Sequence, residues 1–321
     1  MPNKINAYEI AKLAHVSPAT VSRVLNHKNN VNLDTAQKVE AVIAKLGYSR
    51  NANDNARIIL LHVPDITNIF YTDVIAGVQS ACNVENYQLL IDQTELTPDN
   101  EQAFTELLQE IHVYGLITLK QLPTSLLRRL ERVIRIVQCN EFNPDVDLSY
   151  VAIDDYNSAQ QATEQLLIRG YTHPCLLNGP RSFRYSRERE RGYLETLAKH
   201  HIKLNVDWNI SLPAVKFEIA LPAVMQLLSL QQRPDAFFCV SDTLAAAVIV
   251  AAHQAHIQIP KEVAVIGFDD TLIAKTLTPA LSTISQPRFQ LGYSTVGLFR
   301  DYAEGPKHLI LDTELILRQS L

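Results

Sequence analysis

The sequence predicts a small all-α helix-turn-helix unit at the amino end, followed by a larger α/β domain built as two lobes. Three observations lead to this fold class. The first fifty residues carry apolar side chains at helical spacing on either side of a turn signal. From residue 58 onward, apolar strands alternate with amphipathic helices, and the alternation starts again after residue 150. A chain of 321 residues with 47% hydrophobic residues is large enough to bury such cores.

Charge is distributed unevenly along the chain. The formal net charge of -5 argues against nonspecific binding of nucleic acid by the whole molecule. Residues 1–50, however, contain seven Lys or Arg and three Asp or Glu, a charge of +4, which leaves -9 for the remainder. The amino-terminal unit is therefore the part suited to an anionic partner.

Composition also limits location and cofactor chemistry. No stretch approaches 18 consecutive apolar residues, and residues 1–9 lack the basic and apolar regions of a secretory signal, so we expect a cytoplasmic protein with no membrane partner. The cysteines lie far apart, without the spacing of a zinc site or a redox pair, and are expected to be reduced core residues: Cys82, Cys139, Cys175 and Cys239. We expect no cofactor and no metal.

A short first helix is predicted near the amino terminus. Asn6 and Glu9 have the spacing of a capping box. The apolar stripe of this helix is formed by Ile10, Leu13 and Ala14. His15 and Val16 then form the turn.

A second helix begins with a strong start signal and is expected to run to about Leu25. The Ser17 hydroxyl can accept from a free backbone N–H, and Pro18 suits the first helical position. The side chains expected to face the first helix are Val21, Val24 and Leu25. Those expected to face solvent or a DNA groove are Pro18, Ala19, Ser22 and Arg23.

A third helix closes this unit. Asn32 is its expected cap and Gly47 its end, and its apolar face is formed by Val39, Ile43 and Leu46. Any small three-helix bundle shows such periodicity, so the pattern alone leaves DNA binding and a purely structural bundle as equal alternatives.

The residues themselves resemble a known family. The stretches 8–14, 16–17, 20–26, 38–40 and 47–48 resemble the headpiece of the lactose-repressor family. The resemblance implies a transcriptional repressor whose second helix enters the major groove of double-stranded operator DNA. It places Pro18, Ala19 and Arg23 at base-reading positions, where Ala19 can offer a methyl group to thymine and Arg23 can pair with guanine. The positions that the family uses on phosphates are Ser17, Thr20, Ser22 and Asn26. Each serine or threonine among these could instead be a helix cap or a solvated hydroxyl.

The linker departs from the family pattern. Members of the family carry a hinge helix here, whose leucine enters the minor groove, whereas residues 49–57 are rich in Asn and contain no leucine. We therefore expect a short linker in which the hinge helix is shortened or absent. This leaves open how the sensor is coupled to DNA.

The α/β domain is predicted element by element. In lobe one, strands are expected at 58–63, 88–91, 115–119 and 134–138, and helices around 74–81, 100–111 and 126–133. In lobe two, strands are expected at 175–178, 236–240 and 264–268, and helices at 158–169, 188–200 and 243–255. Such doubly wound sheets place ligands at the carboxyl ends of their strands, hence in a cleft between the lobes.

The same resemblance covers this domain. Matching stretches are 63–65, 151–154, 178–180, 189–193, 240–242, 265–270 and 281–287, and the stretches 64–66, 140–142 and 314–316 are most similar to the cytidine-repressor branch. The resemblance implies a sensor resembling a periplasmic sugar-binding protein, with a third inter-lobe strand at 282–286. The expected domains are therefore 1–48 for the headpiece, 49–57 for the linker, 58–156 with 285–321 for lobe one, and 157–284 for lobe two.

The resemblance also implies the effector positions: Phe70, Tyr71, Asp154, Arg189, Ser241 and Asp269. Aromatic faces can stack on a ring, while carboxylates and an arginine can hold hydroxyls or ring nitrogens, which suits a nucleoside, a purine or a sugar. Other roles remain open for these residues. Phe70 and Tyr71 could be core or dimer-contact residues, Asp154 and Ser241 could be helix caps, and Arg189 could belong to a solvated helix face.

Rival classes of function explain less of the sequence. No nucleophile elbow, phosphate-binding glycine loop or metal motif points to an enzyme, and His253 and His256 fit one exposed helical face. A solute-binding protein would explain the two lobes but not the basic headpiece. A regulator with a vestigial, ligand-free sensor remains an alternative. The expected assembly is a homodimer.

Overall fold

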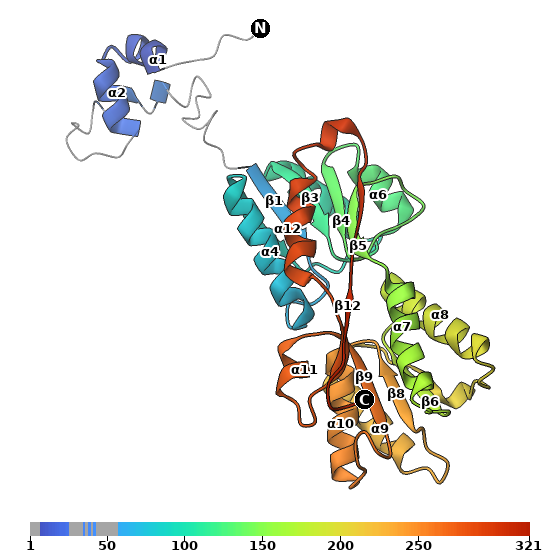
Figure 1. The fold of residues 1–321 in the computed structure, drawn as a ribbon. Helices are drawn as coiled ribbons and strands as arrows, with labels where there is room; N and C mark the ends of the chain where they lie inside the picture. The colour runs from blue at the N-terminus through green and yellow to red at the C-terminus, as the bar shows by residue number, and fades with distance from the viewer. Residues whose placement is uncertain (1–6, 26–34, 36–37, 40, 43–56) are drawn as a thin grey trace. The chain divides into compact units, whose positions relative to one another are not determined.

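A computed structural model describes residues 7–25, 35, 38–39, 41–42 and 57–321. The chain divides into two compact units, Met1–Ala56 and Arg57–Leu321, each of which is described by itself (Figure 1). No helix in the described ranges is long and apolar enough to cross a membrane.

The amino-terminal unit contains the two helices expected from the sequence. Helix α1 (Ala7–Leu13) and helix α2 (Pro18–Leu25) are joined by a turn in which His15 has a φ of 53°. Ser17 Oγ accepts from the backbone N–H of Thr20 at 3.1 Å, which confirms the predicted cap. The core of the unit is formed by Ile10, Ala11, Ala14, Val21, Val24 and Val39.

The predicted apolar stripe of α1 is wrong at one residue. Leu13 is 55% exposed, whereas Ile10, Ala11 and Ala14 are buried. At 100° per residue, the buried arc of α1 runs from Ile10 through Ala14 to Ala11, and Leu13 lies beyond its edge. Other predictions fall on residues outside the described ones: Asn6, Asn26, Asn32, Ile43, Leu46 and Gly47, and the side chains of Glu9, Ser22, Arg23 and Leu25.

Lobe one is built on a parallel sheet of six strands with the order β11-β5-β4-β3-β1-β2. Its strands are β1 (Arg57–His62), β2 (Tyr87–Asp92), β3 (Val113–Thr118), β4 (Arg135–Cys139), β5 (Tyr150–Ile153) and β11 (His308–Leu311). Its helices are α4 (Phe70–Val84), α5 (Glu101–Glu110), α6 (Thr124–Leu130) and α12 (Arg288–Gly297). Successive side chains of β1 point to opposite faces, so Ile59 and Leu61 join the core under α4 and α12, and Leu60 joins the core under α5 and α6.

Lobe two repeats this plan with the strand order β12-β10-β9-β8-β6-β7, in which only β12 is antiparallel. Its strands are β6 (Pro174–Asn178), β7 (Asn209–Ser211), β8 (Ala236–Cys239), β9 (Ala264–Asp269), β10 (Ser282–Ser285) and β12 (Glu314–Ile316). Its helices are α7 (Asp155–Ile168), α8 (Arg184–Lys199), α9 (Phe217–Leu228), α10 (Asp242–Gln254) and α11 (Leu272–Thr276). Single 3₁₀ turns, η1 (Val206–Trp208) and η2 (Tyr302–Glu304), lie in connections.

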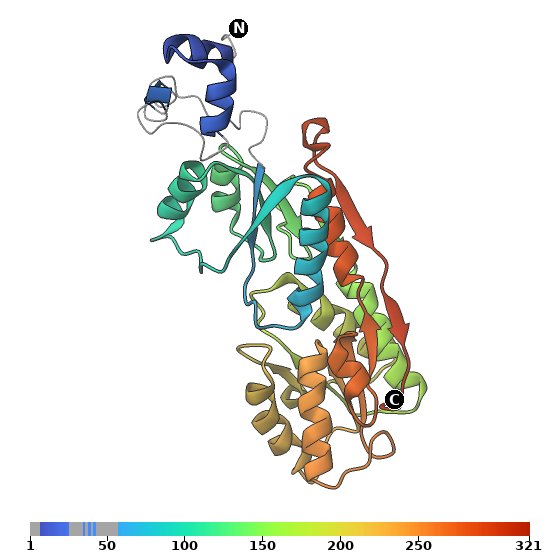
Figure 2. The same cartoon turned by 90° about the vertical axis from the view of Figure 1, so that its left-hand side faces the viewer.

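The chain crosses between the lobes after β5, after β10, and between β11 and β12 (Figures 1 and 2). The expected strand at 282–286 is present as β10, which belongs to the second sheet. The expected assignment of residues 285–321 to lobe one is wrong at its end, because β12 pairs with β10 and Ser320 bonds to Val265 in lobe two. A three-residue strand carries too little periodicity for the sequence to show which sheet it joins.

The predicted strands and helices of both lobes are present, with ends that shift by a few residues. The sequence did not predict the helices α9, α11 and α12 or the strands β5, β7, β11 and β12. Pro222 lies inside α9, where a proline removes one helical hydrogen bond and would signal a break. Burial of Ala220, Val224 and Leu227 along one face outweighs that cost.

Helices α4 and α12 touch through their backbones. A Cβ added at Gly77 would lie 2.0 Å from the carbonyl oxygen of Phe289, and one added at Gly292 would lie 2.0 Å from that of Val74. Neither neighbour is a flexible side chain, so the helices could accept a larger residue only by moving apart.

The variant Gly292→Ala should therefore destabilise the sensor unit by about 1–3 kcal/mol, because the added methyl overpacks the helix contact. Urea unfolding measures this difference in the free energy of unfolding. Gly297→Ala is the matched control, since nothing lies within 4 Å of its added Cβ in the same helix. Equal effects of the two variants would contradict the close contact.

Candidate functional site

A cleft lies where the carboxyl ends of the two sheets face each other, and it holds about 370 Å³ of space, part of it open to solvent. Lobe one lines it with Asn68, Phe70, Tyr71 and Asn140. Lobe two lines it with Tyr185, Arg189, Val215, Val240, Ser241 and Asp269, and Gln286 lines it where the chain leaves β10. This mixture of aromatic and polar groups is typical of a site for a small molecule.

Phe70 and Tyr71 form the wall supplied by lobe one. They are the first two residues of α4, which starts where the Asn68 side chain accepts from the backbone N–H of Phe70 at 3.0 Å. Their rings meet edge to face at a centroid distance of 5.2 Å, and each residue is only 7% exposed. Burial raises the pKa of Tyr71 well above its ordinary value, so this wall stays uncharged.

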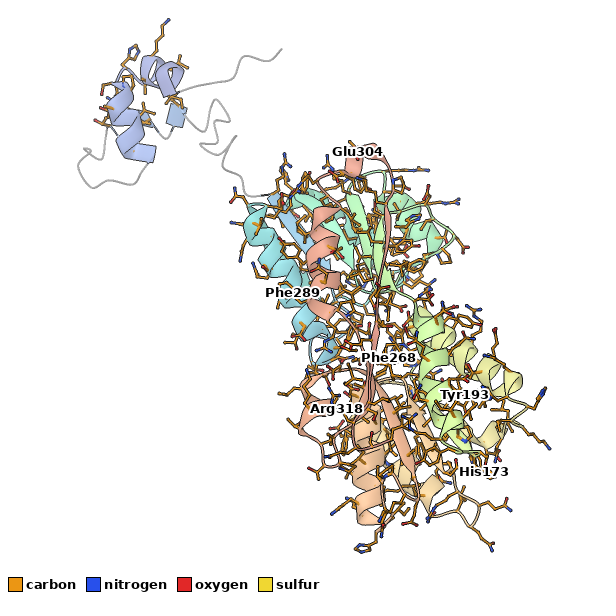
Figure 3. The ribbon with its side chains drawn as sticks, in the orientation of Figure 1. His173, Tyr193, Phe268, Phe289, Glu304 and Arg318 are labelled. Carbon is orange, nitrogen blue, oxygen red and sulfur yellow. The ribbon has the colours of Figure 1, made fainter. Side chains whose placement is uncertain are left out.

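Arg189 on α8 forms the opposite wall. Its guanidinium lies 3.4 Å from the ring centroid of Phe268 and 4.9 Å from that of Tyr185. It donates to Asp155 at 2.9 Å and to the carbonyl of Val240 at 2.7 Å. Figure 3 shows Phe268 where the two lobes meet. With 3% exposure, Arg189 is not part of a solvated helix face, and its planar fork is held by the protein itself.

Asp269 is the last residue of β9 and lines the cleft. Its φ of 113° is rare for a residue with a side chain. Gln286 Nε2 donates to its carboxyl at 2.7 Å, and Arg288 donates to its carbonyl oxygen. Burial raises the pKa of Asp269 to about 8, against the opposing charge of Arg189, so this carboxyl can be protonated near neutral pH.

The two other expected effector residues both cap helices. Ser241 Oγ accepts from the N–H of Leu244 at 3.2 Å at the start of α10, and Ser241 also lines the cleft. Asp154 accepts from the N–H of Asn157 at 2.9 Å and caps α7. The structure does not place Asp154 in the cleft lining, so its cap role is the one observed.

A carboxylate from lobe one caps a helix of lobe two. Glu141 follows β4, and its two oxygens accept from the backbone N–H groups of Arg184 and Tyr185 at 2.7 and 2.9 Å, at the start of α8. Arg184 lies 4.2 Å from the ring centroid of Phe142, and Arg187 donates to Gln121 at 2.6 Å. We call this set of contacts, made by Gln121, Glu141 and Phe142 with Arg184, Tyr185 and Arg187, the α8 latch.

The comparisons with known proteins agree with this architecture. Residues 6–51 match the model of bacterial regulatory proteins of the lacI family, and residues 163–321 match that of a periplasmic binding protein-like domain. The HTH-type transcriptional repressor CytR of Escherichia coli (strain K12) is 30% identical over 325 residues, which cover 97% of this chain and 95% of that protein. The chain belongs to the lacI family.

Other relatives align with nearly the whole length of this lacI-family protein. The ribose operon repressor of Haemophilus influenzae is 30% identical over 328 residues, covering 98% of this chain and 97% of that protein. A structure described as a transcriptional regulator CelR–cellobiose complex matches with a TM-score of 0.75 and 25% identity, covering 99% of this chain and all of that one. The family resemblance of the sequence is thus confirmed, and the protein is a DNA-binding transcriptional regulator with a sensor domain.

Asn140, Tyr185 and Gln286 line the cleft of this lacI-family protein but were not predicted from the sequence, and neither was the role of Glu141. The helix was predicted to begin at residue 188, whereas α8 starts at Arg184. The earlier start was missed because the cap residue, Phe183, offers no capping side chain. The missing cap is supplied by Glu141 from 43 and 44 positions earlier in the chain. Within the described ranges, no group of three His, Cys, Asp or Glu side chains is arranged to hold a metal.

The variant Glu141→Ala should expose the start of α8. Removing the acceptor of two N–H groups destabilises this closed contact by about 1–3 kcal/mol, so the amides of Arg184 and Tyr185 should exchange hydrogen roughly ten times faster or more. Hydrogen exchange measured by NMR or mass spectrometry tests this. Glu188→Ala is the control, because Glu188 pairs with Arg191 within the helix. Unchanged exchange in Glu141→Ala would contradict the latch.

The latch should also depend on pH. Burial raises the pKa of Glu141 to about 7, more than its two N–H partners lower it. From about pH 4.5 to about pH 7 the folded protein therefore keeps a proton that the unfolded chain has lost, and the free energy of unfolding falls as pH rises through this window. Glu141→Gln should make the free energy of unfolding depend less on pH in this window. If the variant and the wild type show the same pH dependence, Glu141 does not titrate there.

Proposed function

We propose that this protein is a cytoplasmic, dimeric repressor that acts by binding alone and whose affinity for operator DNA is set by a nucleoside, a purine or a sugar bound in the cleft. The cleft carries the proposal, because both lobes supply its walls: Phe70 and Tyr71 from one, and Arg189 and Asp269 from the other. Support comes from relatives named as a ribose operon repressor and as a regulator in complex with cellobiose.

The headpiece is proposed to read DNA through α2. Pro18 and Ala19 are exposed at its start, as a base-reading surface requires. The Ser17 and Thr20 hydroxyls lie 2.8 Å apart beside them, where they can donate to phosphate oxygens. By the family resemblance, Arg23 pairs with a base, and Ser22 and Asn26 reach the backbone. A two-fold dimer would present two such helices to half-sites about one helical turn apart.

Coupling between cleft and linker is proposed to run through β1 and α4. Strand β1 begins at Arg57, the last residue of the expected linker, and the connection from β1 to α4 delivers Phe70 and Tyr71 to the cleft. An effector that draws these rings toward Arg189 shifts the element to which the headpiece is tethered. This route needs no hinge helix in residues 49–57.

Arg23→Ala should weaken operator binding far more than binding to random DNA, with a loss of about 1–3 kcal/mol for a base-reading arginine. Fluorescence anisotropy with a selected palindromic duplex and a scrambled duplex, titrated across salt concentration, measures both affinities. Arg169→Ala on lobe two is the control. Equal losses on both duplexes would refute base reading, and a wild type with no sequence preference would refute the proposed function.

Phe70→Leu should reduce the thermal shift produced by an effector, because leucine keeps apolar bulk but removes the ring face. A ligand at a hundred times its Kd stabilises the native state by about 2.7 kcal/mol, which a thermal shift assay over nucleosides, purines and sugars detects. Asp154→Asn is the matched control, since Asp154 caps α7 outside the lining. If both variants respond as the wild type does, the ring does not contact the effector.

A further inference from the structure

Two buried acceptors in the cleft lack partners. Among the described residues, Asn140 Oδ1 and Gln286 Oε1 are buried side-chain oxygens without a hydrogen bond, and both residues are only 5% exposed. They lie in the same lining, Asn140 from lobe one and Gln286 from the crossing after β10. An acceptor left unsatisfied inside a protein is costly, so each is suited to an O–H or N–H group of a ligand.

The cationic donor of the cleft, the guanidinium of Arg189, already has hydrogen-bond partners within the protein. Arg189 is bonded to Asp155 at 2.9 Å through Nε and to the Val240 carbonyl at 2.7 Å through an Nη. Its other Nη lies 2.8 Å from the same Asp155 carboxylate. A phosphate or carboxylate that sought a two-pronged contact with this guanidinium would have to displace Asp155, which is fully buried.

The other arginines near the cleft also have partners within the protein. Arg184 pairs with Asp155, and Arg288 pairs with Asp73. Arg187 of the α8 latch donates to Gln121 and to two backbone carbonyls. Further acidic side chains lie beside the lining or within it: Glu141, Asp242 and Asp269. An anionic ligand would therefore have to compete with the carboxylate, amide and carbonyl groups that already hold these guanidinium groups.

Resting on the proposed sensing role, we propose that the cleft takes an uncharged ligand rich in hydroxyl or N–H donors, such as a nucleoside or a free sugar, and rejects the phosphorylated form of the same molecule. Asn140 and Gln286 accept from the ligand's donors, while Phe70 and Tyr71 cover one face of its ring. Arg189 holds Asp155 and shapes the opposite wall rather than binding an anion.

Matched probe pairs test this with the full-length protein. Isothermal titration and thermal shift compare adenosine, cytidine and D-ribose with adenosine 5′-monophosphate, cytidine 5′-monophosphate and ribose 5-phosphate. We expect the neutral member of the responsive pair to bind at least about tenfold more tightly, since burying a charge without a free partner costs more than one hydrogen bond returns. Equal or tighter binding of a phosphorylated probe overturns the inference but leaves the sensing role intact. A failure of every probe in both series overturns the sensing role itself.

Variants then identify the groups responsible for the preference for the neutral probe. At about pH 9, above the pKa of about 8 of Asp269, Asp269→Asn keeps the shape and the acceptor for Gln286 but removes the charge, so it should narrow the preference for the neutral probe. Asp270→Asn is its control, because the Asp270 carboxylate pairs with Arg318 and Lys275 instead of lining the cleft. Asn140→Ala should weaken the neutral probe by about threefold to tenfold, the range for one lost neutral hydrogen bond, and leave the already weak phosphorylated probe unchanged. A preference that Asp269→Asn leaves intact, or an Asn140→Ala variant that binds normally, counts against the assignment.

Discussion

The cleft depends on one contact, the carboxylate of Glu141 at the start of α8. A helix begins with backbone N–H groups that have no partner within the helix, and α8 has no local side chain to accept from them. Glu141 of the other lobe accepts from two of these groups while buried to 1% exposure. Because α8 carries Tyr185 and Arg189, this contact fixes one wall of the cleft against the other.

The same contact is sensitive to pH because it is buried. An ionised carboxylate at a helix start is favoured by the helix dipole and by two N–H groups, but it loses its hydration when the lobes meet. Loss of hydration is the larger effect, which is why the pKa of Glu141 rises to about 7. The cleft is therefore held by an interaction whose strength changes near neutral pH, beside Asp269, whose pKa burial raises to about 8.

The sequence predicted elements well where their signals are local. Ser17 before Pro18 marks the start of α2, and the apolar runs mark the strands of both sheets. Asp154 and Asp269 show the limit, because Asp154 directly follows a buried strand, Asp269 ends one, and the family resemblance placed both at effector positions. Asp154 is followed at once by α7 and caps it, whereas Asp269 takes a φ of 113° and α11 begins only at Leu272, which leaves its carboxyl in the cleft. The roles of Glu141, Asn140 and Gln286 depend on contacts between distant segments, which no local pattern encodes.

The free energy of the α8 latch is comparable to the free energies that couple regulatory sites in proteins. A capping contact of this kind contributes about 1–3 kcal/mol, and allosteric coupling between two sites is commonly of the same size, about 1–3 kcal/mol. A ligand whose donors satisfy Asn140 in lobe one and Gln286 beside lobe two adds a few bonds of about 1 kcal/mol each to the closed arrangement. Such a ligand can therefore shift the closed population substantially without any single strong contact. In the proposed coupling, β1 would carry that shift toward the headpiece.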